Sequence, residues 1–233
     1  MAGQSRGGEE PPHELTELGR AARHDLSELL GASALHAELL ARSAADALDE
    51  RGRRHLDALR LGLSHLQTLL DGLAEYTWAA SDPLQPSTVD LRELTAEVAE
   101  GLRPQLERQG GSIAVGELPT AVADVPRMRV VMGHLLRNAV THAGRDDVHV
   151  EVGAERDGPA WRVSVADDGR GMSEHERTEV LRPFTRRRRS SDERTAGLGL
   201  SICAAAVKRH GGKLWIDDAD PGAVVRFTLP DCR

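Results

Sequence analysis

Leucines spaced three and four residues apart dominate the first third of the chain. The strictest run consists of Leu56, Leu59, Leu63, Leu66, Leu70 and Leu73. An earlier run with the same rhythm consists of Leu15, Leu18, Ala22, Leu26 and Leu29, continued less strictly by Leu35 and Leu39. Such spacing lines up apolar side chains along one seam of a helix. Residues 13–80 contain no proline, and Asp49 or Gly52 can mark a turn between the runs. The pattern predicts two long antiparallel helices.

Neither helix can bury its apolar seam alone. Pairing the hairpin with a second copy would give a four-helix bundle that buries both seams. A monomeric hairpin packed on the rest of the chain is the alternative. Residues 81–90 then contain two prolines and several helix-capping residues, so they are predicted to form a linker. Asp90 is expected to cap a helix from Leu91 to about Arg108.

The second half of the chain alternates between apolar and polar residues in three places. The apolar members are Val148, Val150 and Val152, then Trp161, Val163 and Val165, and finally Val225, Phe227 and Leu229. Alternation with a period of two indicates half-buried strands. Helices are expected at about 126–143 and 198–211. The predicted fold class is α+β: the helical hairpin, followed by an α/β sandwich in which helices cover one face of a mainly antiparallel sheet.

Composition limits the expected cellular location and the partners of the protein. No apolar run among the 233 residues is long enough to span a membrane. Residues 1–12 are polar, lack the apolar core of a secretory signal and are predicted to be a disordered tail. The two cysteines have no metal-ligand spacing, which favours a reducing, cytoplasmic location. The net charge of −7 argues against nucleic acid as a partner, although Arg186–Arg189 is a local basic run. No membrane partner is expected either.

Three segments of the second half carry candidate chemistry, and the first contains His134, Asn138 and His142. Their spacing of four places them on one face of the expected helix. The Asn138 side-chain oxygen is a candidate ligand for Mg²⁺ beside phosphate groups. Two alternatives remain open at this point: an ordinary surface asparagine, or a transition-metal site on the two histidines.

The second segment runs from Asp167 to Gly171, directly after the expected strand at 161–165. The Asp167 carboxylate can accept a hydrogen bond from an adenine amino group. Gly169 and Gly171 allow the backbone to approach a ligand closely. An ordinary Asp-Gly turn is the alternative.

The third segment is Gly197-Leu198-Gly199, which opens the helix expected at 198–211. Free N–H groups at a helix N-terminus suit phosphate. The segment is not a Walker loop, because no Gly-Lys-Ser/Thr follows. Six arginines between Arg182 and Arg194 suggest a lid over a triphosphate, of which one or two, such as Arg186, would reach it. A solvated run of charges is the alternative.

Taken together and in this order, the segments resemble the catalytic domain of sensor histidine kinases, in the gyrase-like ATPase superfamily. Asn138 resembles the N box, Asp167-x-Gly169-x-Gly171 the G1 box, Pro183-Phe184 the F box and Gly197-x-Gly199 the G2 box. The resemblance covers about residues 88–230. It implies a catalytic ATP-binding domain at 91–233, with ATP and Mg²⁺ as cofactors. It also implies that Asn138, His142, Asp167 and the glycine-rich segments contact the nucleotide.

The first half is similar to the dimerisation and phosphoacceptor helices of the same kinases. His24-Asp25-Leu26 is closest to the phytochrome-like group, and the hairpin would occupy residues 13–80. The resemblance implies that His24 accepts the phosphoryl group and that Asp25 is its acid/base partner. The implied partners are a second copy of the chain, a response regulator receiver domain and possibly a separate sensor protein. The implied activity is an ATP-dependent histidine autokinase.

The sequence also departs from the family pattern. Glu28 and Leu29 stand where a polar residue and a proline are usual, which argues against the phosphatase reaction of the family. His134 stands where hydrolytic relatives carry a glutamate that activates water, which argues against a plain ATPase. Two alternatives follow: a weak or inactive phosphotransfer scaffold of the same fold, or a serine kinase of the same superfamily.

Overall fold

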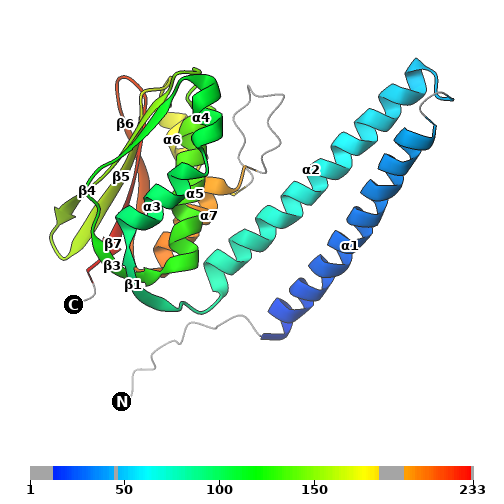
Figure 1. Cartoon of the computed structure of the whole chain (residues 1–233). Helices are drawn as coiled ribbons and strands as arrows, with labels where there is room; N and C mark the ends of the chain where they lie inside the picture. Colours follow the sequence, from blue (N-terminus) through cyan, green and yellow to red (C-terminus); the bar gives the residue numbers. More distant parts are fainter. Residues whose placement is uncertain (1–12, 45–46, 184–196, 232–233) are drawn as a thin grey trace, which may run out of the picture. The chain divides into compact units, whose positions relative to one another are not determined.

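Figure 1 shows the computed structural model of the chain. It describes residues 13–44, 47–183 and 197–231, with side chains from Asp25 onward. The chain divides into two compact units, Met1–Ala74 and Glu75–Arg233. The predicted tail at 1–12 and the predicted lid residue Arg186 lie outside the described residues.

The first unit contains α1 (His13–Ser43) and most of α2 (Glu50–Ser81). Asp49 precedes α2, and its Oδ1 accepts a hydrogen bond of 2.7 Å from the Gly52 backbone N–H. This is the geometry of a helix N-cap, so the turn between the helices ends at Asp49. Arg60 of α2 forms an ion pair with Glu38 of α1, which ties the two antiparallel helices together.

The leucine run of α2 separates into two layers. Leu56 is buried and Leu63 and Leu70 are half-buried, whereas Leu59, Leu66 and Leu73 are 52%, 49% and 41% exposed. On α1, Ala37 is buried, but the predicted seam residues Leu26, Leu29, Leu35 and Leu39 are exposed. These four leucines are therefore not covered within a single chain, and the predicted four-helix bundle would need a second copy to bury them.

The second unit is built on a five-stranded sheet. The strand order is β2 (Ser112–Val115), β4 (His149–Asp157), β5 (Ala160–Asp167), β7 (Ala223–Pro230) and β6 (Leu214–Asp218). Only the pair of β2 with β4 is parallel. The prediction of a mainly antiparallel sheet is confirmed.

Helices cover one face of this sheet, as Figure 1 shows for α3 (Leu91–Glu100), α5 (Val125–His142) and α7 (Gly199–Arg209). The core lies between the layers, where Leu136 of α5 and Ile202 of α7 are buried, as are Val163 and Phe227 of the sheet. The short helices α4 (Arg103–Gln109) and α6 (Glu174–Glu179) complete the unit. The predicted α+β fold class is confirmed.

Two local expectations differ from the structure. Residues 86–90, expected in a linker, form β1 (Pro86–Asp90), which pairs antiparallel with β3 (Thr120–Asp124). Pro86 is tolerated there because it is the first residue of the strand. The helix expected at 91–108 is interrupted between α3 and α4, where Gly101 ends α3 and a proline lies in the first turn of α4. Asp90 caps α3 as expected, since its carboxylate accepts hydrogen bonds from the N–H groups of Arg92 and Glu93.

Within the second unit, a buried arginine of α5 holds the end of α2. Arg127 of α5 is 2% exposed and forms a 2.7 Å ion pair with Asp124. Its Nη2 donates to the backbone carbonyls of Trp78, at 2.9 Å, and Asp82, at 2.7 Å. The guanidinium also lies over the Trp78 ring, 4.6 Å from its centroid, a favourable cation–π arrangement. Because its charge is paired and both terminal nitrogens donate hydrogen bonds, Arg127 can be buried at this position.

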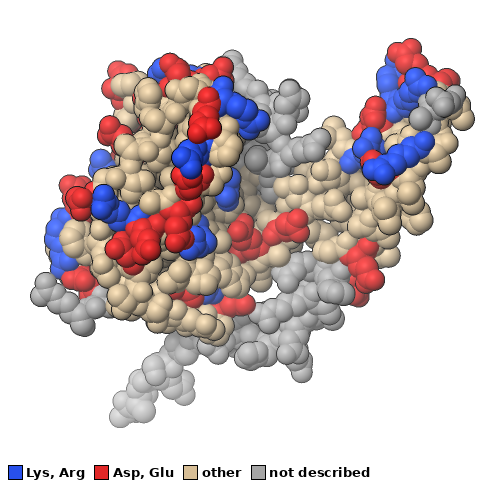
Figure 2. Space-filling model, viewed as in Figure 1, with Lys and Arg blue, Asp and Glu red and all other residues tan. Residues whose placement is uncertain are grey.

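Charged side chains of both signs cover the second unit. Figure 2 shows basic and acidic residues beside one another on its visible face. Some of these opposite charges form ion pairs, such as that of Arg129 with Glu97 at 2.6 Å. Within the described ranges, no helix has the length and apolar character needed to cross a membrane.

Candidate functional site

The polar stripe of α5 is the centre of the candidate site. Asp124 caps this helix by accepting a hydrogen bond from the Arg127 N–H at 3.0 Å. His134, Asn138 and His142 are half-buried, while the apolar residues between them pack into the core, namely Leu135, Leu136, Ala139 and Val140. The spacing of four that predicted a shared face is therefore realised on a regular helix.

The start of α7 lies directly against this stripe. A Cβ atom placed on Gly199 would be 3.1 Å from His134 Nδ1 and 3.7 Å from Asn138 Nδ2. A larger residue at 199 would have to displace the His134 ring, so the glycine permits the close approach. Two segments that are 61 residues apart in the sequence, at Asn138 and Gly199, thus meet in space.

The segment from Asp167 to Gly171 lies against the C-terminal end of the same helix. A Cβ on Gly169 would be 2.6 Å from the Ala143 Cα, closer than real atoms approach. The Arg170 N–H donates to the Ala143 carbonyl at 2.8 Å. Ala143 follows Asn138 by five residues, about 7.5 Å along a helix axis. All three sequence segments are therefore gathered along one end of α5.

Local hydrogen bonds hold the loop after β5 in shape. Asp167 Oδ1 accepts from the Gly169 N–H at 3.0 Å, and Asp168 Oδ1 accepts from the His149 N–H at 2.8 Å. Arg145 also forms an ion pair of 3.3 Å with Asp168. Gly171 has a φ of +69°, a backbone conformation that favours glycine. The sequence offered no signal for the contribution of Arg145, which lies in a polar loop.

The other predicted site residues lie on other elements or are not among the residues that the structure describes. His24 is in the middle of α1, but its side chain is outside the described residues. Asp25 is exposed on the same helix. Gly197 and Leu198 precede α7, with Leu198 buried. Arg186 and Phe184 lie outside the described residues. The second unit thus brings together the predicted nucleotide-binding residues that the structure describes, and His24 belongs to the first unit.

Sequence reasoning missed Glu75, which reaches this site from α2. Glu75 belongs to the second unit, and its Oε2 lies 2.8 Å from His134 Nε2. The hydrogen bond from His134 holds the pKa of the Glu75 carboxyl below its ordinary value, against the opposing effect of partial burial. The two residues are 59 positions apart, so no local pattern connects them.

The residues present fit a magnesium–nucleotide complex. Among the described residues no group of three or more histidine, cysteine or acidic side chains can hold a metal. Mg²⁺ bound with nucleotides needs only one or two protein oxygens, because phosphates and water supply the other ligands. Asn138 can supply one such oxygen, and the space kept open by Gly199 is at the N-terminus of α7, where free N–H groups suit phosphate.

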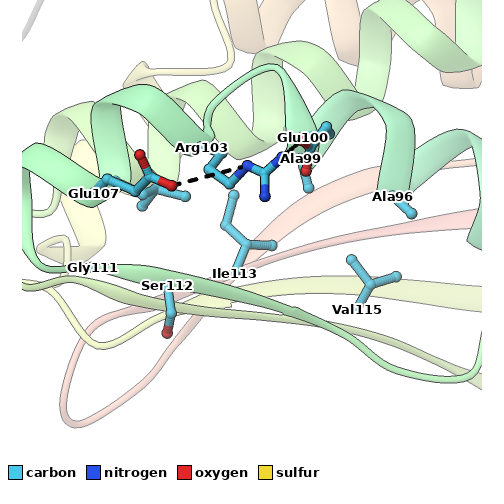
Figure 3. A pocket seen from close by; sticks show the side chains of 10 residues that line it. Ala96, Ala99, Glu100, Arg103, Glu107, Gly111, Ser112, Ile113 and Val115 are labelled. Carbon is cyan, nitrogen blue, oxygen red and sulfur yellow. Dashed lines mark hydrogen bonds and ion pairs between the residues drawn. The ribbon is translucent and has the colours of Figure 1, made fainter.

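A separate cavity of about 420 Å³ lies between α3, α4 and β2. Figure 3 shows Arg103 at its rim between Glu100 and Glu107, with Ile113 below. Its lining contains none of the predicted nucleotide-binding residues. The candidate site is therefore the surface along α5, and this cavity is a distinct feature.

Comparison with known proteins agrees with this placement. Residues 123–233 match the family described as histidine kinase-, DNA gyrase B-, and HSP90-like ATPase. The chain is 27% identical over 218 residues to the phytochrome-like protein Cph1 of Synechocystis sp.; this match covers 93% of the chain but only 29% of Cph1.

Solved structures show the same likeness. Full-length ShkA, in complex with AMPPNP, matches with a TM-score of 0.70 at 28% identity, over 92% of this chain and 45% of that one. Histidine kinase ThkA, in complex with the response regulator protein TrrA, matches with a TM-score of 0.64 at 23% identity, over 94% of this chain and 63% of that one. Residues 123–233 thus match the histidine kinase-, DNA gyrase B-, and HSP90-like ATPase family, and the chain as a whole is similar in sequence and fold to sensor histidine kinase cores.

Proposed function

We propose that the protein is an ATP-dependent histidine autokinase that passes its phosphoryl group to a response regulator. The observation that carries the proposal is the assembly of Asn138, Gly199 and the Asp167–Gly171 loop along α5. These are the groups needed to bind a metal, phosphates and a purine, and the chain also carries a histidine on a long helical hairpin.

Each group of the site has a distinct role in binding. The Asp167 carboxylate accepts a hydrogen bond from the adenine amino group, and the N–H groups at the start of α7 bind phosphate oxygens. The Asn138 oxygen holds Mg²⁺, which when bound neutralises charge on the phosphates. His142, one turn further along α5, lines the same face, and Arg186 adds positive charge.

The reacting group is the imidazole of His24. One ring nitrogen attacks the γ-phosphorus, so that an N–P bond forms while the bond from phosphorus to the ADP oxygen breaks. Asp25 takes the proton from the other ring nitrogen, which leaves a phosphohistidine whose imidazole ring is neutral and whose phosphoryl group carries the negative charge. Catalysis is then mainly positioning and charge neutralisation.

The proposal includes two protein partners. The exposed leucine layer of α2 supports a homodimer through the hairpin, because a second copy would bury it in a four-helix bundle. A response regulator receives the phosphoryl group on an aspartate; ThkA, which shares the fold, was solved in complex with such a protein. A sensor in another protein would supply the signal. We place the reaction in the cytoplasm, where ATP is available.

Incubation with γ-labelled ATP tests the autokinase directly. The wild type is expected to acquire acid-labile, base-stable label, and His24→Gln is expected to reduce labelling to background because the nucleophile is lost. His36→Gln is a matched control, since His36 is exposed on the same helix. Equal labelling of wild type and His24→Gln would contradict the proposal.

A phosphotransfer scaffold without kinase activity is the second candidate. It is favoured by Glu28, which is exposed one turn after His24 and would repel a phosphoryl group there. Nucleotide titration separates the two candidates, because the scaffold predicts no ATP binding at millimolar concentration.

A further inference from the structure

The Glu75–His134 contact links α2 to the polar stripe of α5. His134 is half-buried, with its Nε2 2.8 Å from Glu75 Oε2 and its Nδ1 beside Gly199. Both ring nitrogens are therefore in defined surroundings. Glu75 lies outside residues 123–233, the part of the chain that matches the ATPase family.

The carboxylate determines which nitrogen carries the hydrogen. An ionised Glu75 can only accept a hydrogen bond, so Nε2 must be the donor. The lowered pKa of Glu75 agrees with an ionised partner. In a neutral imidazole the hydrogen is then on Nε2, and Nδ1 keeps its lone pair.

The surroundings of Nδ1 agree with an acceptor. Arg137 Nη2, a donor from the same helix, lies 3.5 Å from Nδ1. The space at Gly199 is bordered by Nδ1 and by the Asn138 side-chain amide. The acceptor atom Nδ1 of His134 therefore lies on the same side of α5 as Asn138, the proposed metal ligand.

We propose that Glu75 is a positioning residue for nucleotide binding: through His134 it presents an acceptor to the water shell of nucleotide-bound Mg²⁺. The inference rests on the proposed function for the presence of Mg²⁺ and nucleotide. Mg²⁺ keeps several of its waters when it binds with nucleotides, and these waters are hydrogen-bond donors. Outer groups that orient such contacts strongly affect metal affinity.

The first test is spectroscopic and needs no nucleotide. ¹⁵N NMR of the His134 imidazole in the full chain is expected to show the Nε2–H tautomer in the wild type. Glu75→Gln is expected to shift the population towards Nδ1–H, because a glutamine amide can also donate to Nε2. Glu97→Gln, which alters a surface ion pair of the same unit, is the control. A wild-type Nδ1–H tautomer, or no change in Glu75→Gln, would overturn the proposal.

The second test measures ATP affinity with and without Mg²⁺. Glu75→Gln is expected to lose about tenfold of the Mg²⁺-dependent affinity, while affinity for metal-free ATP stays unchanged. Glu97→Gln should change neither. An equal loss under both conditions would indicate a merely structural role and reject the inference. Absence of ATP binding by the wild type would instead reject the proposed function. The tautomer measurement needs no nucleotide, so it tests the Glu75–His134 contact even if ATP does not bind.

Discussion

Arg127 is the largest side chain that is fully buried in the described part of the second unit. Its charge is balanced by Asp124, and its remaining contacts are backbone carbonyls of residues 78–83 and the ring of Trp78. Hydrogen bonds to Arg127 and the Gln85 N–H lower the pKa of Asp124, although burial opposes this. The pair therefore stays ionised in the interior and holds two distant chain segments together.

Replacing Arg127 is expected to destabilise the second unit strongly. Arg127→Met should lower its free energy of unfolding by about 3–5 kcal/mol, because Asp124 is left as an unpaired buried charge. Arg129→Met is the matched control; Arg129 lies on the same helix in an exposed ion pair, so its loss should cost less than about 1 kcal/mol. Chemical denaturation monitored by Trp78 fluorescence measures both. Equal stability of the two variants would show that the buried pair contributes little.

At this scale the sequence identified residues whose role follows from local pattern. The polar stripe of a helix points to Asn138, the end of a strand to Asp167, and the glycine-rich start of a helix to Gly199. Glu75 and Arg127 could not be found in this way. Their distant partners lie 44 to 59 residues away, and only the tertiary fold brings them together.

At the scale of elements, α2 has one apolar run with two environments. Leu56, Leu63 and Leu70 are covered within the chain, whereas Leu59, Leu66 and Leu73 are exposed. These correspond to the two alternating positions of a heptad, and in a four-helix bundle both layers are buried. The exposed layer is thus the part of the helix that the proposed dimer would cover.

Charges in this layer are expected to dissociate the dimer. Leu59→Glu combined with Leu66→Glu should weaken dimerisation at least about 100-fold, since each buried leucine contributes about 1.5–3 kcal/mol. Leu61→Glu is the control, because Leu61 is equally exposed but lies off the heptad run. Sedimentation across a concentration series measures the effect. A wild type that is monomeric at every concentration would contradict the homodimer.

The sequence predicted elements well where periodicity is strong. The strands β4, β5 and β7 were recognisable because apolar and polar residues alternate over five positions in or beside each of them. The strands β1 and β3 were not, because β1 begins with a proline and its paired residues in β3 are 30 to 38 positions away. For the exposed leucines of α1, periodicity shows that the helix is amphipathic but not which neighbour covers its apolar face.

At the scale of the whole molecule, the second unit begins at Glu75, inside α2. The match to the ATPase family begins only at residue 123. The intervening residues contribute Trp78, the carbonyls that Arg127 binds, the strand β1 and the helices α3 and α4. They are structural parts of the second unit.

Two fragments test this boundary. Fragment 75–233 is expected to unfold with the same stability as the second unit of the full chain. Fragment 86–233 should be less stable by about 3 kcal/mol or more, because Arg127 loses its carbonyl partners and the Trp78 ring. Thermal denaturation of both fragments gives the comparison. Equal melting temperatures would place the boundary after residue 85.

The tie between Arg127 and the end of α2 also bears on how sensor kinases can be recombined. A chimera that takes its ATP-binding module from this protein should be joined upstream of Glu75, within the helix itself. A junction in the proline-containing stretch after α2 would transfer Arg127 without the Trp78 ring and the backbone carbonyls to which it donates hydrogen bonds.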